Sequence, residues 1–266
     1  MINKEDYEEP RCLLCMEDDR SEKTDTRRLA SKLDAFYARN DDAGAERFLL
    51  GWLAESGQTG DKALEFFVRN ELIGLYRKSG RKDECLDNAD KAISLAEELG
   101  ISERGDGAYA FINAATAYKA FGYPEIAVML FERILPACER DLAPGYALGS
   151  FYNNAALAYC DAKRYDDARA FYEKALATME SVPGYEAELA ITYLNIADLV
   201  AAQRGAEEEI NKLLQKAQSL LESGISDTDT NYAFVCSKCA PVFAHYGMNE
   251  YADALSERSR RIYERA

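Results

Sequence analysis

Two Cys-x-x-Cys pairs are the residues whose chemistry is easiest to name. Cys12 and Cys15 form the first pair, and Cys236 and Cys239 form the second. Each pair could supply two thiolates, and four thiolates make a structural zinc site. The pairs stand near opposite ends of the chain, which is an unusual spacing for zinc. Three interpretations stay open: a zinc site, thiol–disulfide exchange, or small thiols that pack at helix interfaces.

Enzyme chemistry has few candidates in this chain. His245 is the only histidine, so a Ser-His-Asp or Cys-His arrangement has little to work with. No Gly-rich phosphate-binding loop is present, and the many carboxylates are scattered along expected helix exteriors. We therefore expect no enzyme activity, and no cofactor apart from the zinc that the cysteine pairs leave open.

Three asparagines recur at a fixed spacing. Asn113, Asn154 and Asn195 follow one another at equal intervals along the chain. An asparagine amide offers an acceptor and two donors, so a row of three could hold a peptide backbone without regard to its sequence. The alternative is that these amides only tie neighbouring helices together. We call this row the asparagine ladder.

The asparagine ladder belongs to a longer internal repeat. Residues 110–135 read AFINAATAYKAFGYPEIAVMLFERIL, and residues 151–176 read FYNNAALAYCDAKRYDDARAFYEKAL, so the aligned pairs keep the same interval as the asparagines. Apolar residues follow a helical period from about Thr26 to the end. A fixed period of this length is typical of a stacked array of helical hairpins.

Six repeat units can be placed in register. They begin near residues 26, 66, 108, 149, 190 and 233. The first helix of each unit carries Phe36, Tyr76, Tyr118, Tyr159, Val200 or Phe243, and the second carries Ala45, Cys85, Ala127, Ala168, Ile210 or Ala252. Antiparallel helices meet closely only where one of them presents a small residue. The pattern weakens in the fifth unit, which needs one inserted residue, and in the sixth, which carries Ser256 and Ser259 at apolar or small positions.

The N-terminal segment, residues 1–25, differs from the rest. It is acidic, includes Pro10 and shows no helical period. We therefore expect an acidic N-terminal tail over residues 1–25, which carries the first Cys-x-x-Cys pair, and a repeat array over residues 26–266. The tail could fold back against the basic residues of the array.

Composition limits the class of partner and the compartment. The net charge is −15 and the isoelectric point is about 4.7, which argues against a nucleic-acid partner and against an anionic membrane surface. No apolar run is long enough to span a membrane. The start lacks the basic and apolar regions of a secretory signal, and the seven cysteines do not resemble a disulfide scaffold. We therefore expect a cytoplasmic protein.

One unit shows the pattern most completely. Its aromatic and small residues are Tyr152, Ala155, Ala156, Tyr159, Ala168, Tyr172 and Ala175. This order resembles the tetratricopeptide repeat, and the longer unit is similar to the variety of about 42 residues found in kinesin light chains and many bacterial proteins. The resemblance implies an all-α superhelix of about six hairpins, with first helices on a concave face and second helices at the back.

The resemblance also implies where a ligand would bind. Family ligands, usually peptides, lie along the concave face, and the asparagine ladder occupies a position that faces it. Other residues expected there are Asn70, Arg77, Lys78, Tyr109, Lys119 and Asn153.

We therefore expect a non-enzymatic scaffold that binds a protein or peptide segment. One alternative is a zinc- or redox-responsive protein that uses the four paired cysteines. Another is a scaffold that forms homo-oligomers through its back face or its ends. The sequence names neither the ligand nor the pathway.

Overall fold

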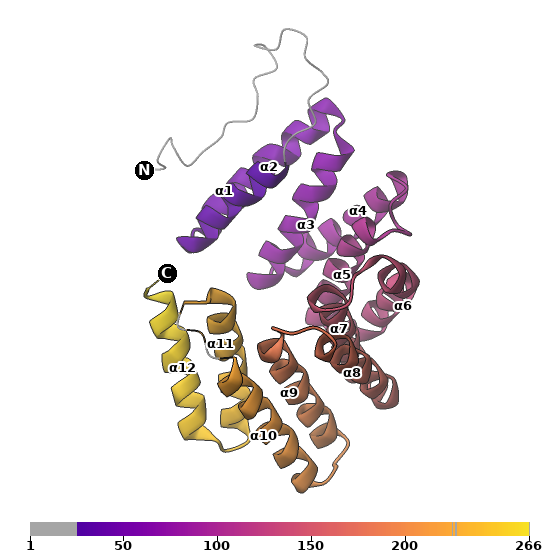
Figure 1. The fold of residues 1–266 in the computed structure, drawn as a ribbon. Helices are drawn as coiled ribbons and strands as arrows, with labels where there is room; N and C mark the ends of the chain where they lie inside the picture. The colour runs from indigo at the N-terminus through magenta and orange to yellow at the C-terminus, as the bar shows by residue number, and fades with distance from the viewer. Residues whose placement is uncertain (1–25, 225, 227, 266) are drawn as a thin grey trace. The chain divides into compact units, whose positions relative to one another are not determined.

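The computed structural model describes residues 26–224, 226 and 228–265 (Figure 1). Twelve helices, and no strand, are found over these residues. They follow one another as six hairpins, which confirms the all-α repeat fold predicted from the period. The predicted tail, with Cys12 and Cys15, lies outside the described residues.

The chain divides into two compact units, Met1–Ala137 and Cys138–Ala266, and the division falls within α6. Unit 1 contains α1 (Thr26–Ala38), α2 (Asp42–Thr59), α3 (Lys62–Lys78), α4 (Lys82–Glu98), α5 (Gly105–Ala120) and most of α6 (Pro124–Asp141). In this unit α3 packs against α2, α4 and α5. The first helices α3 and α5 are therefore direct neighbours.

Unit 2 contains α7 (Tyr146–Asp161), α8 (Tyr165–Glu180), α9 (Glu186–Ala202), α10 (Glu207–Ser223), α11 (Thr230–His245) and α12 (Asn249–Tyr263). Each first helix packs against its own second helix, as α7 does against α8. The first helix α9 also packs against α7 and α11. The first helices of this unit are therefore also adjacent to one another.

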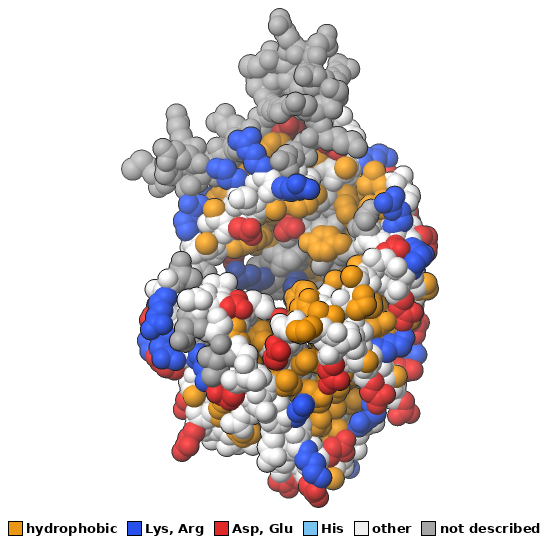
Figure 2. All heavy atoms as spheres, viewed as in Figure 1, with side chains coloured by type: hydrophobic (Ala, Val, Ile, Leu, Met, Phe, Trp, Pro, Cys, Tyr) orange, Lys and Arg blue, Asp and Glu red, His pale blue; other side chains and the backbone are white. Residues whose placement is uncertain are grey.

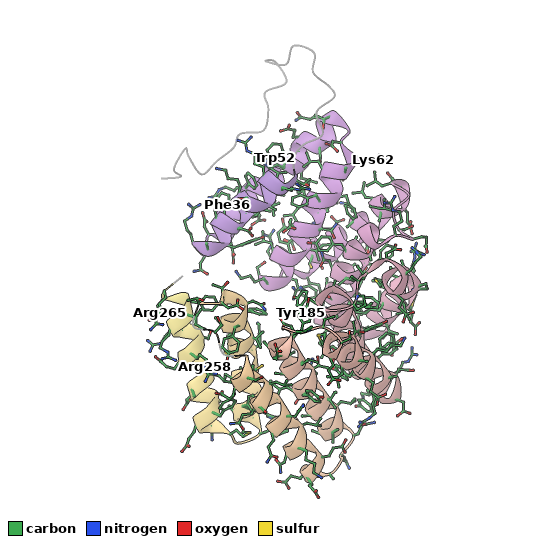
Figure 3. The ribbon with its side chains drawn as sticks, in the orientation of Figure 1. Phe36, Trp52, Lys62, Tyr185, Arg258 and Arg265 are labelled. Atoms are coloured by element: carbon green, nitrogen blue, oxygen red, sulfur yellow. The ribbon has the colours of Figure 1, made fainter. Side chains whose placement is uncertain are left out.

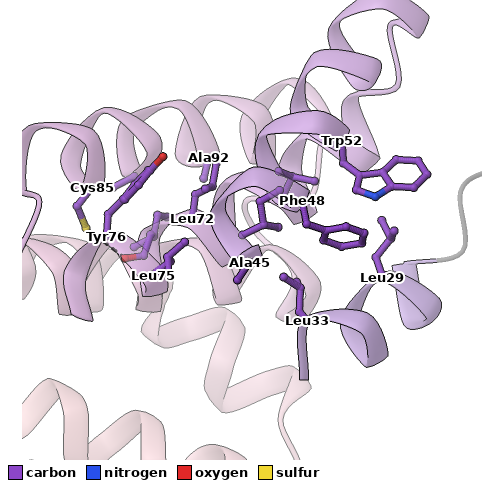
Figure 4. Packing of buried hydrophobic residues seen from close by; sticks show 14 of the residues in the cluster. Leu29, Leu33, Ala45, Phe48, Trp52, Leu72, Leu75, Tyr76, Cys85 and Ala92 are labelled. Carbon is purple, nitrogen blue, oxygen red and sulfur yellow. Dashed lines mark hydrogen bonds between the residues drawn. The ribbon is translucent and has the colours of Figure 1, made fainter. Parts of the chain in front are cut away.

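The predicted pairing of aromatic and small residues is found in the core. Phe36 and Tyr76 are each only 4% exposed, and their small partners Ala45 and Cys85 are fully buried. Figure 4 shows this cluster, in which Trp52 of α2 lies beside Leu29 of α1. Because the small residues leave room for the rings, the two helices of a hairpin approach closely.

The turn inside each hairpin has the same backbone conformation. One residue in each turn takes a positive φ: Asn40, Gly80, Gly122, Lys163, Arg204 and Gly247. In this left-handed conformation a helix ends because its last carbonyls are satisfied by N–H groups that follow the turn. The repeat is thus visible in the backbone even where the residue is not glycine.

A polar contact between the second helix of one repeat and both helices of the next links successive repeats. Lys174 Nζ lies 2.8 Å from Glu139 Oε1 and 5.4 Å from the centroid of the Tyr152 ring. The Tyr152 hydroxyl donates to Glu139 Oε1 at 3.0 Å. The acid belongs to one repeat, and the ring and the base belong to the next. We call this group of three side chains a clasp.

Similar clasps recur at the spacing of the repeat. They are Glu97, Phe111 and Arg133 in unit 1, and Glu180, Tyr193 and Lys216, followed by Glu222, Tyr232 and Arg258, in unit 2. Their contacts differ: Phe111 has no hydroxyl to donate, Lys216 lies over the Tyr193 ring, and Arg258 donates both to Glu222 and to the Tyr232 hydroxyl. The base of the last clasp is the least exposed of the four bases, since the Arg258 side chain is only 14% exposed. Arg258 is labelled in Figure 3. The clasps join neighbouring hairpins through polar groups in addition to the apolar core.

Candidate binding surface

Three of the asparagines expected to bind a ligand, Asn70, Asn113 and Asn153, link neighbouring first helices. Asn70 is 1% exposed, and its Nδ2 donates to the Phe66 carbonyl at 2.8 Å. Its Oδ1 accepts from Asn113 Nδ2 at 3.3 Å, which links α3 to α5. Asn153 Nδ2 donates to Thr192 Oγ1 at 2.8 Å, which links α7 to α9. These contacts match the alternative in which such amides have a structural role.

Asn154 and Asn195 are placed differently. They stand at matching positions of α7 and α9, two helices that pack against each other. Both residues are half-buried, and neither side chain makes a hydrogen bond within the described part of the chain. Two amides of the ladder are therefore available to bind another molecule in unit 2.

In unit 1 a different group of side chains joins α1, α3 and α5. Asp34, Tyr37, Glu71, Tyr109 and Asn113 form what we call the acid–tyrosine cluster. The Tyr109 hydroxyl donates to Glu71 Oε1 at 3.2 Å. Nearly half of the Tyr109 side chain is exposed, at 46%, although its hydroxyl lies against Glu71. The cluster combines carboxylates with partly exposed rings.

Glu71 was missed in the sequence, although the repeat locates it. The step from Glu71 to Asn113 equals the step between the starts of their two units, so Glu71 occupies the ladder position of α3. The same reasoning places Lys238 at this position in α11, one unit after Asn195. A search for identical asparagines overlooks Glu71 and Lys238, whereas the repeat register locates the ladder position whatever residue occupies it.

The environment of the acid–tyrosine cluster shifts its acids and phenols. Burial raises the pKa of Glu71; the hydrogen bond from Tyr109 lowers it, and the carboxylate of Asp34 raises it further. Burial also raises the pKa of Tyr37 to about 12, with Glu71 as the next cause. The shift of Glu71 is that of a carboxylate removed from water with no cation beside it among the described residues, and the shift of Tyr37 is that of a partly buried phenol near negative charge.

The basic residues expected on this surface are also located. Lys78 Nζ lies 2.9 Å from Asp42 Oδ1 and so forms an ion pair within unit 1. Arg77 is exposed, and Lys119 is half-buried. The docking of the acidic tail against these three residues involves the tail, which lies outside the described residues.

Gly74 lies one turn after Glu71, on the same face of α3. A Cβ at this position would meet no atom within 4 Å, so packing does not require a glycine. Gly74→Ala is expected to raise the free energy of unfolding by about 0.5–1 kcal/mol, because glycine destabilises a helix interior. Gly57→Ala in α2, where a Cβ would also meet no atom, should give a similar gain. Urea unfolding measures the free energy of unfolding of both variants. A lower value for Gly74→Ala would contradict the open space around the added Cβ.

The second cysteine pair lies inside unit 2. Cys236 and Cys239 are 0% and 1% exposed. Burial raises the pKa of the Cys239 thiol to about 12, and burial is also the largest cause that raises the pKa of Cys236. Within the described residues no group of three or more side chains could hold a metal ion. The other half of the proposed zinc site, Cys12 and Cys15, lies outside them.

The start of α6 and the residue before it carry exposed apolar side chains. Met129 is 65% exposed, and Tyr123 and Ile126 are 38% and 37% exposed. On the face shown in Figure 2, hydrophobic side chains form patches between interspersed acidic and basic ones. No described helix has both the length and the apolar character needed to cross a membrane.

Comparison with known proteins agrees with the repeat architecture. The model of the tetratricopeptide repeat family matches residues 148–223. Among solved structures, BtubC (BKLC) from P. vanneervenii is similar over 77% of this chain and 83% of its own, with 21% identity and a TM-score of 0.65. NprR, solved in complex with its cognate peptide NprX, is similar over 90% of this chain and 68% of its own, with 18% identity and a TM-score of 0.56.

A curated relative is much longer than this chain. The clustered mitochondria protein homolog of Coccidioides immitis (strain RS) is 24% identical over 167 residues, which are 62% of this chain and 13% of that protein. The similarity thus covers a small part of the relative. The family model thus identifies tetratricopeptide repeats over residues 148–223, and the similar solved structures show the same helical fold over a larger part of the chain.

Proposed function

We propose that this tetratricopeptide-repeat protein is a non-enzymatic scaffold that binds an extended peptide or protein segment along its first helices. The observation that supports this most is the pair of amides on Asn154 and Asn195, which make no hydrogen bond within the described part of unit 2. The similarity to NprR, which was solved with a bound peptide, is a second support.

The chemistry of the two amides suits a peptide main chain. Each offers two donors and an acceptor, which complement the C=O and N–H groups of an extended backbone. Because both side chains are half-buried, water competes with such bonds less than it would on an open surface. The contacts would hold the main chain in place and leave selectivity to the side chains around it.

The experiment starts from the whole chain and a library of random dodecapeptides displayed on phage. Dissociation constants of selected peptides are then measured by fluorescence anisotropy. Asn154→Ala and Asn195→Ala are each expected to weaken binding by about 1–3 kcal/mol, because a polar group of the peptide loses its partner. The melting temperature should stay nearly unchanged, since neither amide has a hydrogen bond to lose within the described residues.

A matched control is Asn211→Ala. Asn211 is exposed on the second helix α10 and should leave peptide binding unchanged. If no peptide is selected, the proposed function is wrong. If Asn154→Ala lowers stability and leaves affinity unaltered, the amide has a structural role instead.

Composition supports the kind of partner and the compartment. None of the five described cysteines forms a disulfide, and four of them are buried, as expected in a reducing compartment such as the cytoplasm. The net charge of −15 favours a protein partner over a nucleic acid.

A further inference from the structure

The acids of unit 1 differ in how their charge is balanced. Most of those in described contacts lie beside a cation: Asp42 with Lys78, Glu46 with Arg81, Glu65 with Arg69, Asp87 with Lys91, Glu97 with Arg133 and Glu98 with Lys62. Glu71 is half-buried, and within the described residues no cation lies beside it. Its neighbours are a second acid, Asp34, and the hydroxyl of Tyr109.

Without a ligand, the partly buried charge of Glu71 destabilises the cluster. A carboxylate that is partly removed from water is stable only when hydrogen bonds or an opposite charge replace the water. The Tyr109 hydroxyl supplies one hydrogen bond to Glu71, while Asp34 adds a second negative charge. The charge of the acid–tyrosine cluster is thus uncompensated within the described part of the chain.

The rings of the cluster suit a cation as well. Tyr37 is half-buried on α1, and Tyr109 is 46% exposed on α5. The face of a tyrosine ring attracts an ammonium or guanidinium group that lies within about 6 Å of its centre. Gly74, one turn from Glu71, leaves the surface of α3 without a side chain, so that a ligand can approach closely.

We propose that the acid–tyrosine cluster is a subsite for one basic side chain, lysine or arginine, of the bound peptide. Glu71 accepts the N–H donors of that side chain, Asp34 adds to the negative field, and the rings of Tyr37 and Tyr109 pack against its cationic group. The inference rests on the proposed function, because it names a feature of the peptide that the first helices bind.

The test uses peptides selected from the same random library on the full chain. Lysine or arginine is expected in nearly all selected sequences that require Glu71. Glu71→Gln should weaken these peptides about tenfold or more, since a charge-assisted hydrogen bond is lost. Replacing the basic residue of the peptide by glutamine should weaken binding to the native chain by a similar factor and have little further effect on Glu71→Gln.

The control is Glu98→Gln, which removes an acid of the same unit that pairs with Lys62 on its surface. Affinity should then be unchanged, and thermal unfolding checks that both variants fold. If selected peptides lack a basic residue but depend on Asn154, the subsite is wrong and the proposed function stands. If basic peptides are selected and Glu71→Gln binds them equally well, the subsite is also wrong. If no peptides are selected, both proposals fail.

Discussion

Phe243→Ala is expected to lower the free energy of unfolding by about 3–5 kcal/mol, because a fully buried ring is removed and a cavity remains. Phe243 is 0% exposed, and its ring centroid lies 4.9 Å from that of Tyr251 in an edge-on contact between α11 and α12. In a repeat array each hairpin depends mainly on its neighbour. Hydrogen exchange should therefore accelerate most in α11 and α12, and urea unfolding gives the size of the loss.

Phe234 provides a matched control for this experiment. It lies on the same helix, α11, and is 48% exposed. Phe234→Ala should change stability by less than about 0.5 kcal/mol, as is usual for surface substitutions. Equal losses for the two variants would contradict the burial on which the prediction rests.

Arg258→Ala is expected to cost about 2–3 kcal/mol, the largest loss for any base of the four clasps, because its removal leaves polar partners with less access to water. Arg258 Nη1 lies 3.1 Å from Glu222 Oε1 and donates to the Tyr232 hydroxyl at 2.7 Å. Its side chain is only 14% exposed. Chemical denaturation at neutral pH measures the loss.

Lys174→Ala is the control within the same structural motif. Its side chain is 46% exposed, so the contact with Glu139 should contribute less than about 1 kcal/mol. Similar losses for the two variants would show that burial does not govern the strength of a clasp.

The stability lost in Arg258→Ala should depend on pH. Burial raises the pKa of Glu222, but hydrogen bonds from Arg258 and Tyr251 outweigh it and leave the pKa below its ordinary value. A lowered pKa stabilises the fold above the unfolded-state pKa, and this contribution is lost as pH falls through the folded-state value. The effect of Arg258→Ala should therefore shrink on acidification.

The hairpins could be predicted because their signal is repeated. The positions of Phe36, Tyr76 and Phe243 recur with the period, and each ring is buried as that pattern indicates. Ser259 was noted as a departure from an apolar or small pattern, yet it is 5% exposed in the core of the last hairpin. A small residue fits there because space, more than polarity, is what the second helix must provide.

The use of each polar group could not be predicted in the same way. Asn70 and Asn154 are both asparagines of first helices, but one donates to its own helix while the other makes no hydrogen bond within the described residues. Such a choice depends on side-chain direction and on the neighbouring helix. The pairing of Lys78 with Asp42, which lie on different helices, depends on the same tertiary geometry.

Because the clasps recur with the repeat, the contacts between successive repeats involve equivalent positions. Each takes its acid from one repeat and its base and ring from the next, so the same three positions meet between successive repeats even where the residues and their contacts differ. Deleting residues 140–180 would put Glu139 in the place of Glu180, opposite Tyr193. Gene duplication or loss of a single unit would thus keep an acid opposite the next ring. Under the proposed function, the length of peptide that the array binds would then change by whole repeats.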